Sequence, residues 1–159
     1  MNQPPTIIVI PARMRSQRLP DKPLAKIGGL PMIVQVWRRA CEAEIGPVLV
    51  ACAEKEIAEA VEAHGGEAIL TDPDLPSGTD RILQALTRFD PERRYGDVIN
   101  LQGDLPSLGP EPIRAALDPI RVLGTDIGTL ATPIVDPAER TNPNTVKAVI
   151  AFDRQHPRL

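Results

Sequence analysis

Basic side chains cluster between residues 12 and 26, in a stretch whose chemistry suits an anion. The stretch carries five positive charges and one negative charge, whereas the whole chain has a net charge of −3. The positive residues are Arg13, Arg15, Arg18, Lys22 and Lys26. Arginine presents a planar fork that suits phosphate oxygens, and lysine offers a compact point charge. We interpret residues 12–26 as an anion-binding loop, called the basic loop below. The alternative is a solvated loop whose arginines pair with acids elsewhere.

The basic loop is stiffened by proline and lacks the glycines of the common phosphate-binding loops. Prolines at positions 11, 20 and 23 each fix their own φ and restrict the residue before them. No glycine lies between Pro11 and Lys22, which excludes both a Walker A loop and a G-x-G-x-x-G motif. Side chains, more than a glycine-lined backbone, would therefore hold the phosphates.

Two further motifs contain residues suited to a nucleotide site. Ser77 lies just before an apolar helical pattern, where a serine is ordinarily an N-cap. Asp104 follows a predicted strand and a glycine, so its carboxylate could hold Mg²⁺ against phosphates. The alternative for Asp104 is a capping group in a turn, and from the residues alone we favour that alternative.

The elements that must position these residues alternate between strand and helix. Residues 7–10 are apolar and end at Pro11, as expected of a short buried strand. Further strands are predicted at 48–52, 67–71, 97–101, 126–134 and 145–152. The predicted helices begin near Pro31 and run to Gly46, cover 54–64, continue from Ser77 through Phe89, and cover 111–117. This alternation predicts an α/β fold with an open, doubly wound, mostly parallel sheet, with the basic loop at the carboxyl end of its first strand.

Composition limits the classes of protein that remain. The length of 159 residues suits one domain, and the aromatic content of 3% requires a core of Val, Ile, Leu and Ala. We find no signal peptide and no membrane span, which favours a cytoplasmic location. We expect Cys41 and Cys52 to be reduced and buried. The pI near 5.4 argues against nucleic acid as a partner.

The string from Ile10 to Leu24, Ile-Pro-Ala-Arg-Met-Arg-Ser-Gln-Arg-Leu-Pro-Asp-Lys-Pro-Leu, resembles the nucleotide-binding signature of the 3-deoxy-manno-octulosonate (Kdo) cytidylyltransferases. Three later segments resemble the same family in the same order, Ser77–Arg81, Gln102–Pro106 and Asn142–Lys147. The resemblance implies a three-layer, Rossmann-like nucleotidyltransferase fold, with residues 1–159 as a single nucleotide-binding domain. It also implies transfer of CMP from CTP to Kdo, which gives CMP-Kdo and pyrophosphate for lipopolysaccharide synthesis, with Mg²⁺ as the metal.

The resemblance also implies roles for individual residues. Arg13 and Lys22 are the expected catalytic residues, and Asp104 is the expected metal ligand. The expected nucleotide-binding residues are Ala12, Arg13, Arg18, Lys22, Ser77, Gly78, Thr79 and Gln102. The chain departs from the family at three positions: Leu75 replaces a histidine, Leu105 a glutamate and Ala53 an aspartate. The last of these removes an expected helix cap.

Family members continue well beyond the point that matches Leu159. By resemblance, the further part carries most sugar-acid contacts, a second metal-binding aspartate and the contacts of a homodimer. We therefore expect a truncated form of the fold that does not make CMP-Kdo at a useful rate by itself. Two alternatives remain open: a cytidylyltransferase for sialic acid or another sugar acid, and a non-catalytic nucleotide-binding module.

Overall fold

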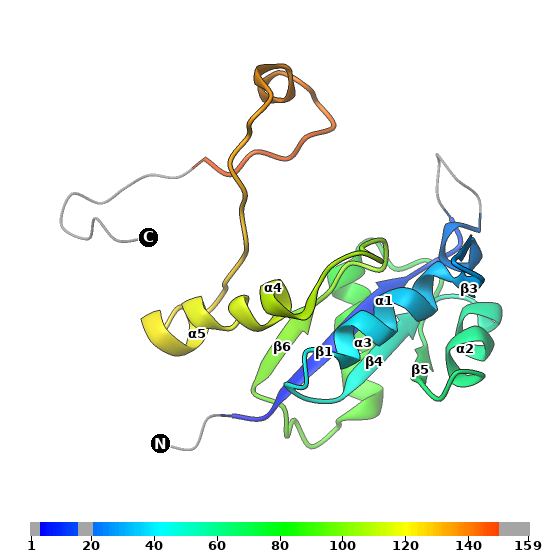
Figure 1. Ribbon diagram of the computed structural model, residues 1–159. Helices are drawn as coiled ribbons and strands as arrows, with labels where there is room; N and C mark the ends of the chain where they lie inside the picture. Colours follow the sequence, from blue (N-terminus) through cyan, green and yellow to red (C-terminus); the bar gives the residue numbers. More distant parts are fainter. Residues whose placement is uncertain (1–3, 16–20, 150–159) are drawn as a thin grey trace. The chain divides into compact units, whose positions relative to one another are not determined.

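The computed structural model describes residues 4–15 and 21–149 (Figure 1). The chain divides into two units, Met1–Gly128 and Thr129–Leu159, and each is described by itself. That residues 1–159 act as a single nucleotide-binding domain stays a prediction.

The first unit is built on a parallel sheet of four strands (Figure 1). In chain order the strands are β1 (Thr6–Ala12), β4 (Val48–Cys52), β5 (Glu67–Leu70) and β6 (Asp97–Asn100). Their spatial order is β5-β4-β1-β6, with Ile8 of β1 paired to Val48 on one side and to Ile99 on the other. The chain therefore builds outward from β1 through β4 to β5 and then returns to the opposite side of β1. This reversal creates a topological switch point between β1 and β6, where open α/β sheets bind ligands.

The central strand β1 is covered on both faces, which explains its run of apolar residues. Ile8 and Ile10 point into one hydrophobic cluster, whereas Ile7 and Val9 point into the other, and all four are fully buried. Successive side chains of a strand face opposite sides of the sheet, so a strand between two helical layers must be apolar throughout.

Helices cover both faces of this sheet. The cluster around Ile8 contains residues of α1 (Met32–Cys41), α2 (Lys55–Glu62) and α4 (Pro110–Ala115). The cluster around Ile7 contains Ile82 and Ala85 of α3 (Gly78–Phe89). The predicted three-layer α/β fold with a mostly parallel sheet is confirmed. None of the helices among the described residues is long and apolar enough to cross a membrane.

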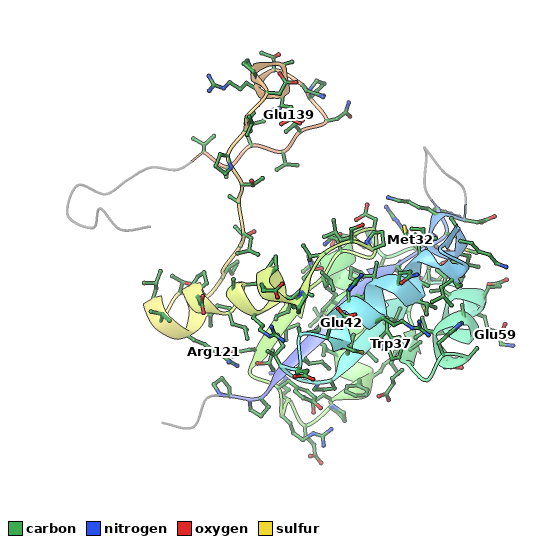
Figure 2. The ribbon with its side chains drawn as sticks, viewed as in Figure 1. Met32, Trp37, Glu42, Glu59, Arg121 and Glu139 are labelled. Atoms are coloured by element: carbon green, nitrogen blue, oxygen red, sulfur yellow. The ribbon has the colours of Figure 1, made fainter. Side chains whose placement is uncertain are left out.

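Two labelled side chains in Figure 2 fix helices of the first unit. Trp37 of α1 packs partly buried against the core, and a Cβ at Gly66 would lie 2.9 Å from its ring, so Gly66 leaves the space that the indole needs. Arg121 lies in α5 (Asp118–Leu123) and donates from Nε to Asp97 Oδ2 at 2.9 Å. The carboxylate of Asp97 is buried at the start of β6, so this pair attaches α5 to the sheet.

Four sequence predictions need correction. The strand predicted to end at Pro11 continues to Ala12, because proline lacks only the backbone donor and the extended chain still pairs there, with Pro11 opposite Ala51. Cys52 is buried as predicted, but Cys41 is exposed, because it lies one position beyond the buried Ala40 and so turns away from the apolar face of α1. Residues 126–134 and 145–149 form no strand, because they pair with no described strand and their backbone groups have no ladder. Residues 150–152 lie outside the described residues.

The remaining described elements are short. In the first unit they are the 3₁₀ helix η1 (Lys22–Leu24) and the hairpin strands β2 (Lys26–Ile27) and β3 (Leu30–Pro31). In the second unit the 3₁₀ helix η2 (Pro137–Arg140) is capped by Asp136, whose carboxylate accepts from the Ala138 N–H.

Candidate functional site

The switch point brings two predicted motifs together at the carboxyl ends of neighbouring strands. The basic loop leaves β1, and the segment Gln102–Asp104 leaves β6. The pairing of the two strands continues past β6, since the Leu101 N–H donates to the Val9 carbonyl at 3.1 Å. A Cβ at Gly103 would lie 2.9 Å from the Pro11 carbonyl oxygen. Glycine at 103 therefore allows this turn to lie directly against the end of β1.

A pocket of about 170 Å³ opens beside this junction. Five of the residues predicted to bind nucleotide line it: Ala12, Arg13, Ser77, Gly78 and Gln102. Pro11 and Arg81 also line it, whereas Thr79 is not among the described residues of the lining. The structure thus joins segments near positions 12, 78 and 102 around one concave surface, which is where a small ligand would bind.

The start of α3 contributes a capped helix end to this pocket. Ser77 is the N-cap, and its hydroxyl oxygen accepts from the Asp80 N–H at 3.2 Å. The Ser77 hydroxyl also donates to the Asp80 carboxylate. The predicted capping role is confirmed. Because that hydroxyl is already engaged with α3, the free N–H groups of the first turn are what the helix end can offer a ligand.

Arg81 lines the pocket, although the sequence analysis matched its segment Ser77–Arg81 to the family without giving Arg81 a role of its own. Its side chain is only 2% exposed, and its Nη1 donates to the Thr71 hydroxyl and to the Asp72 carbonyl, the latter at 3.2 Å. Its Nη2 is buried and has no hydrogen-bond partner among the described residues. An arginine in the first turn of a helix opposes the helix dipole, and this was the available signal that a role other than helix stability places it there.

The electrostatics around Arg81 indicate a site for oxygen-bearing ligands. Burial lowers the pKa of its guanidinium, Glu54 opposes that shift, and the nearby charge of Arg13 adds to it. Arginine nevertheless stays protonated in proteins. A buried cation with one unpaired N–H group costs free energy, and an acceptor atom placed in the pocket would remove part of that cost.

Outside the pocket lining, Lys22 and Asp104 form an ion pair. Lys22 Nζ donates to Asp104 Oδ2 at 2.8 Å, and their side chains are 35% and 51% exposed. Lys22 opens η1 directly after Asp21, which adopts the left-handed conformation at φ 54°. The turn at Asp21 thus brings the predicted phosphate-binding lysine to the predicted metal-binding carboxylate.

Asp104 suits a magnesium ion that also binds phosphates. Among the described residues, no group of three or more His, Cys, Asp or Glu side chains could hold a metal. Mg²⁺ does not need such a cage, because it commonly takes one or two carboxylates and completes its shell with water and substrate phosphates. The exposed carboxylate of Asp104 at the carboxyl end of β6 fits that pattern.

The other basic residues that the sequence analysis singled out lie in different surroundings. Arg13 is exposed and lines the pocket, whereas Arg15 lies 3.7 Å from the exposed Asp74, the kind of pairing foreseen in the alternative for this loop. Arg18 lies outside the described residues. In the second unit, Lys147 donates to the backbone carbonyl of Asn142 within its own turn.

A family model and curated proteins similar to this chain all describe cytidylyltransferases. A family model described as cytidylyltransferase matches residues 7–156. The chain is 57% identical over 146 residues to the 3-deoxy-manno-octulosonate cytidylyltransferase of Paramagnetospirillum magneticum, covering 92% of this chain and 59% of that protein. It is 62% identical over 148 residues to the protein of the same description from Rhodospirillum rubrum, covering 92% and 58%. The chain therefore spans less than two thirds of the length of these curated relatives.

Solved structures show the same likeness. The structure of CMP:2-keto-3-deoxy-manno-octonic acid synthetase complexed with CTP superposes with a TM-score of 0.68 at 42% identity, covering 74% of this chain and 47% of that one. A nucleotidyl transferase from Methanothermobacter thermautotroptrophicus superposes with a TM-score of 0.59 at 20% identity, covering 71% and 56%. The second likeness concerns the fold alone.

Proposed function

Because the chain belongs to the cytidylyltransferase family, we propose that it transfers CMP from CTP to Kdo, giving CMP-Kdo and pyrophosphate. The observation that carries the proposal is the pocket at the switch point, together with the ion pair between Lys22 of the loop after β1 and Asp104 of the turn after β6. The choice of CTP and Kdo is supported by the relatives, whose descriptions name a Kdo cytidylyltransferase and a CTP complex.

In this proposal the pocket holds the nucleoside part of CTP. Arg81 Nη2 supplies a buried donor without another partner among the described residues, which suits a carbonyl or hydroxyl oxygen of the ligand. Gln102 adds an amide that donates to Asn100 Oδ1 at 3.0 Å and is exposed enough to exchange that bond for one to the ligand. Ala12, Gly78 and the N–H groups of the first turn of α3 would line the remaining wall.

Arg13, Arg18 and Lys22 would hold the triphosphate. The anomeric hydroxyl of Kdo attacks the α-phosphorus and loses its proton to solvent. The new O–P bond forms, the bond from the α-phosphorus to the bridging oxygen breaks, and pyrophosphate leaves with that electron pair. Catalysis of such a transfer depends on positioning and on neutralising developing charge. Fixed cations beside the phosphates provide both, and Lys22 is held in place by its pair with Asp104.

Asp104 would hold Mg²⁺, which when bound supplies charge neutralisation and orients the phosphate oxygens. The proposal also includes Thr79 as a neighbour of the nucleotide, a cytoplasmic location and, as implied for the longer family members, a homodimer. The acidic pI near 5.4 supports small-molecule substrates over nucleic acid.

Two measurements test the proposal. Calorimetry with CTP, UTP and ATP in the presence of Mg²⁺ should show preferential binding of CTP, and equal or absent binding would overturn the assignment of the pocket. Pyrophosphate release from CTP is then compared with Kdo and with N-acetylneuraminate as acceptors. The enzyme for this assay is a chimera that joins residues 1–159 to the part of the Rhodospirillum rubrum relative that this chain does not cover, because residues 1–159 alone are not expected to turn over. Release that depends on Kdo supports the proposal, and release that depends on N-acetylneuraminate assigns another sugar acid. Binding of CTP without release from either acceptor would overturn transfer and indicate a nucleotide-binding module.

A further inference from the structure

Glu54 makes a contact outside its own helix, and the proposed function gives this contact no role. It occupies the N-cap position of α2, yet its side chain makes no capping hydrogen bond to that helix. Its Oε2 instead accepts from the backbone N–H of Met14, which lies 40 residues earlier, at 2.9 Å. The acceptor is a carboxylate, so this is one of the stronger kinds of hydrogen bond.

The contact is one of two that fix the backbone on either side of Arg13. The Ala53 N–H donates to the Ala12 carbonyl at 3.2 Å, which extends the pairing of β1 with β4 by one bond. Glu54 then holds the N–H of Met14, whose side chain packs against the core. Arg13 therefore lies between two anchored residues, while its own side chain is exposed and lines the pocket.

The charge of Glu54 opposes the binding of a triphosphate, so its position needs another explanation. Glu54 is close enough to Arg81 that its negative charge raises the pKa of that guanidinium, against the larger effect of burial. A carboxylate near an anion site repels phosphate. Two contributions offset this repulsion: the attraction between Glu54 and the buried Arg81, and the hydrogen bond from the Met14 N–H.

We propose that Glu54 is a positioning residue of the nucleotide site, which holds residues 12–14 against the end of β4 so that Arg13 faces the pocket. It acts through the backbone of Met14 and does not touch the ligand. The inference rests on the proposed function, because its purpose is the placement of a phosphate-binding arginine.

The test compares Glu54→Gln with Glu54→Ala. Both variants remove the negative charge, but the glutamine amide oxygen can still accept from the Met14 N–H. The difference between the two therefore isolates the hydrogen bond from the charge. We expect CTP to bind Glu54→Ala roughly fivefold to tenfold more weakly than Glu54→Gln, the effect of one hydrogen bond. Equal affinities for the two variants would overturn the proposal.

A second measurement needs no nucleotide. Amide hydrogen exchange at Met14 should be several-fold faster in Glu54→Ala than in Glu54→Gln, and equal exchange rates in the two variants would also overturn the proposal. Glu56→Ala is the matched control, because it removes one exposed charge from the first turn of the same helix. If the unaltered chain did not bind CTP, the proposed function would fail, while the exchange at Met14 would still decide whether Glu54 holds the loop.

Discussion

Lys22 Nζ lies 2.8 Å from Asp104 Oδ2, although 82 residues separate them in the sequence. The lysine comes from the loop after β1 and the aspartate from the turn after β6, which are neighbouring strands. A group suited to phosphate and a group suited to a metal therefore meet at one point. Because both side chains remain partly exposed, the pair serves the placement of charge more than stability.

Replacement of Lys22 by alanine should weaken CTP binding by roughly 1–3 kcal/mol, the range for a charge-assisted contact. The free energy of unfolding should change by less than about 1 kcal/mol, because the pair is partly exposed. Calorimetry and urea denaturation measure the two quantities. Lys26→Ala is the control, since Lys26 is an exposed residue of the same loop. If the two variants bound CTP with equal affinity, Lys22 would belong to a solvated ion pair and would not contact the triphosphate.

The variant Asp104→Asn should bind CTP with little or no response to Mg²⁺, because the amide is a poor ligand for this hard cation. The fold should remain intact, since the carboxylate is half exposed. Titrations of CTP with and without Mg²⁺, together with circular dichroism, check both statements. Asp126→Asn removes another exposed carboxylate and should keep the response to Mg²⁺. An unfolded Asp104→Asn variant would make Asp104 a structural turn residue.

An alanine at position 103 should separate the turn after β6 from the end of β1. Its Cβ would lie 2.9 Å from the Pro11 carbonyl oxygen, a backbone atom that has little freedom to move. We expect a loss of stability of roughly 1–3 kcal/mol, as for other overpacked positions, together with weaker binding of CTP. Gly109→Ala is the matched control, because a Cβ there meets only the flexible Glu111 side chain. Similar stabilities of the two variants would show that the turn does not need glycine.

The buried thiol of Cys52 leads us to expect that the folded chain loses stability in alkaline solution. Burial, followed by the charge of Glu54, raises the pKa of its thiol from 9.0 to about 11. The folded chain thus keeps a proton that the unfolded chain releases. The resulting stabilisation is complete below pH 9 and disappears as the pH rises to about 11.

Urea denaturation at several pH values measures this effect. Between pH 9 and 11 the free energy of unfolding should fall by on the order of 2 kcal/mol more in the unaltered chain than in Cys52→Ala. The comparison removes the contributions of tyrosine and lysine, which titrate in both proteins. Parallel pH profiles for the two proteins would show that the Cys52 thiol does not control stability in this range.

Local patterns in the sequence predicted much of the fold and part of the site. The apolar run 7–10, the Ser77 cap and the turn at Gly103 depend on residues close in sequence, and the structure has all three. The burial of Arg81 depends on Thr71 and Asp72, which no local period connects to it. The strand expected at 126–134 and the described part, 145–149, of the strand expected at 145–152 were wrong, because an apolar pattern cannot supply the neighbouring strand that a ladder requires.

The strand order has a consequence for when the site can form. Every contact between the loop after β1 and the turn after β6 requires these two strands to be paired, and Thr6 of β1 pairs with Asp97 of β6. Closing so long a loop is slow compared with local helix formation, because chain entropy is lost before the contacts form. During synthesis, the ribosome must therefore release residues beyond Asp104 before Lys22 has its partner. A nascent chain that has folded only through β5 would contain Lys22 but would still lack Asp104, with which Lys22 pairs in the complete fold.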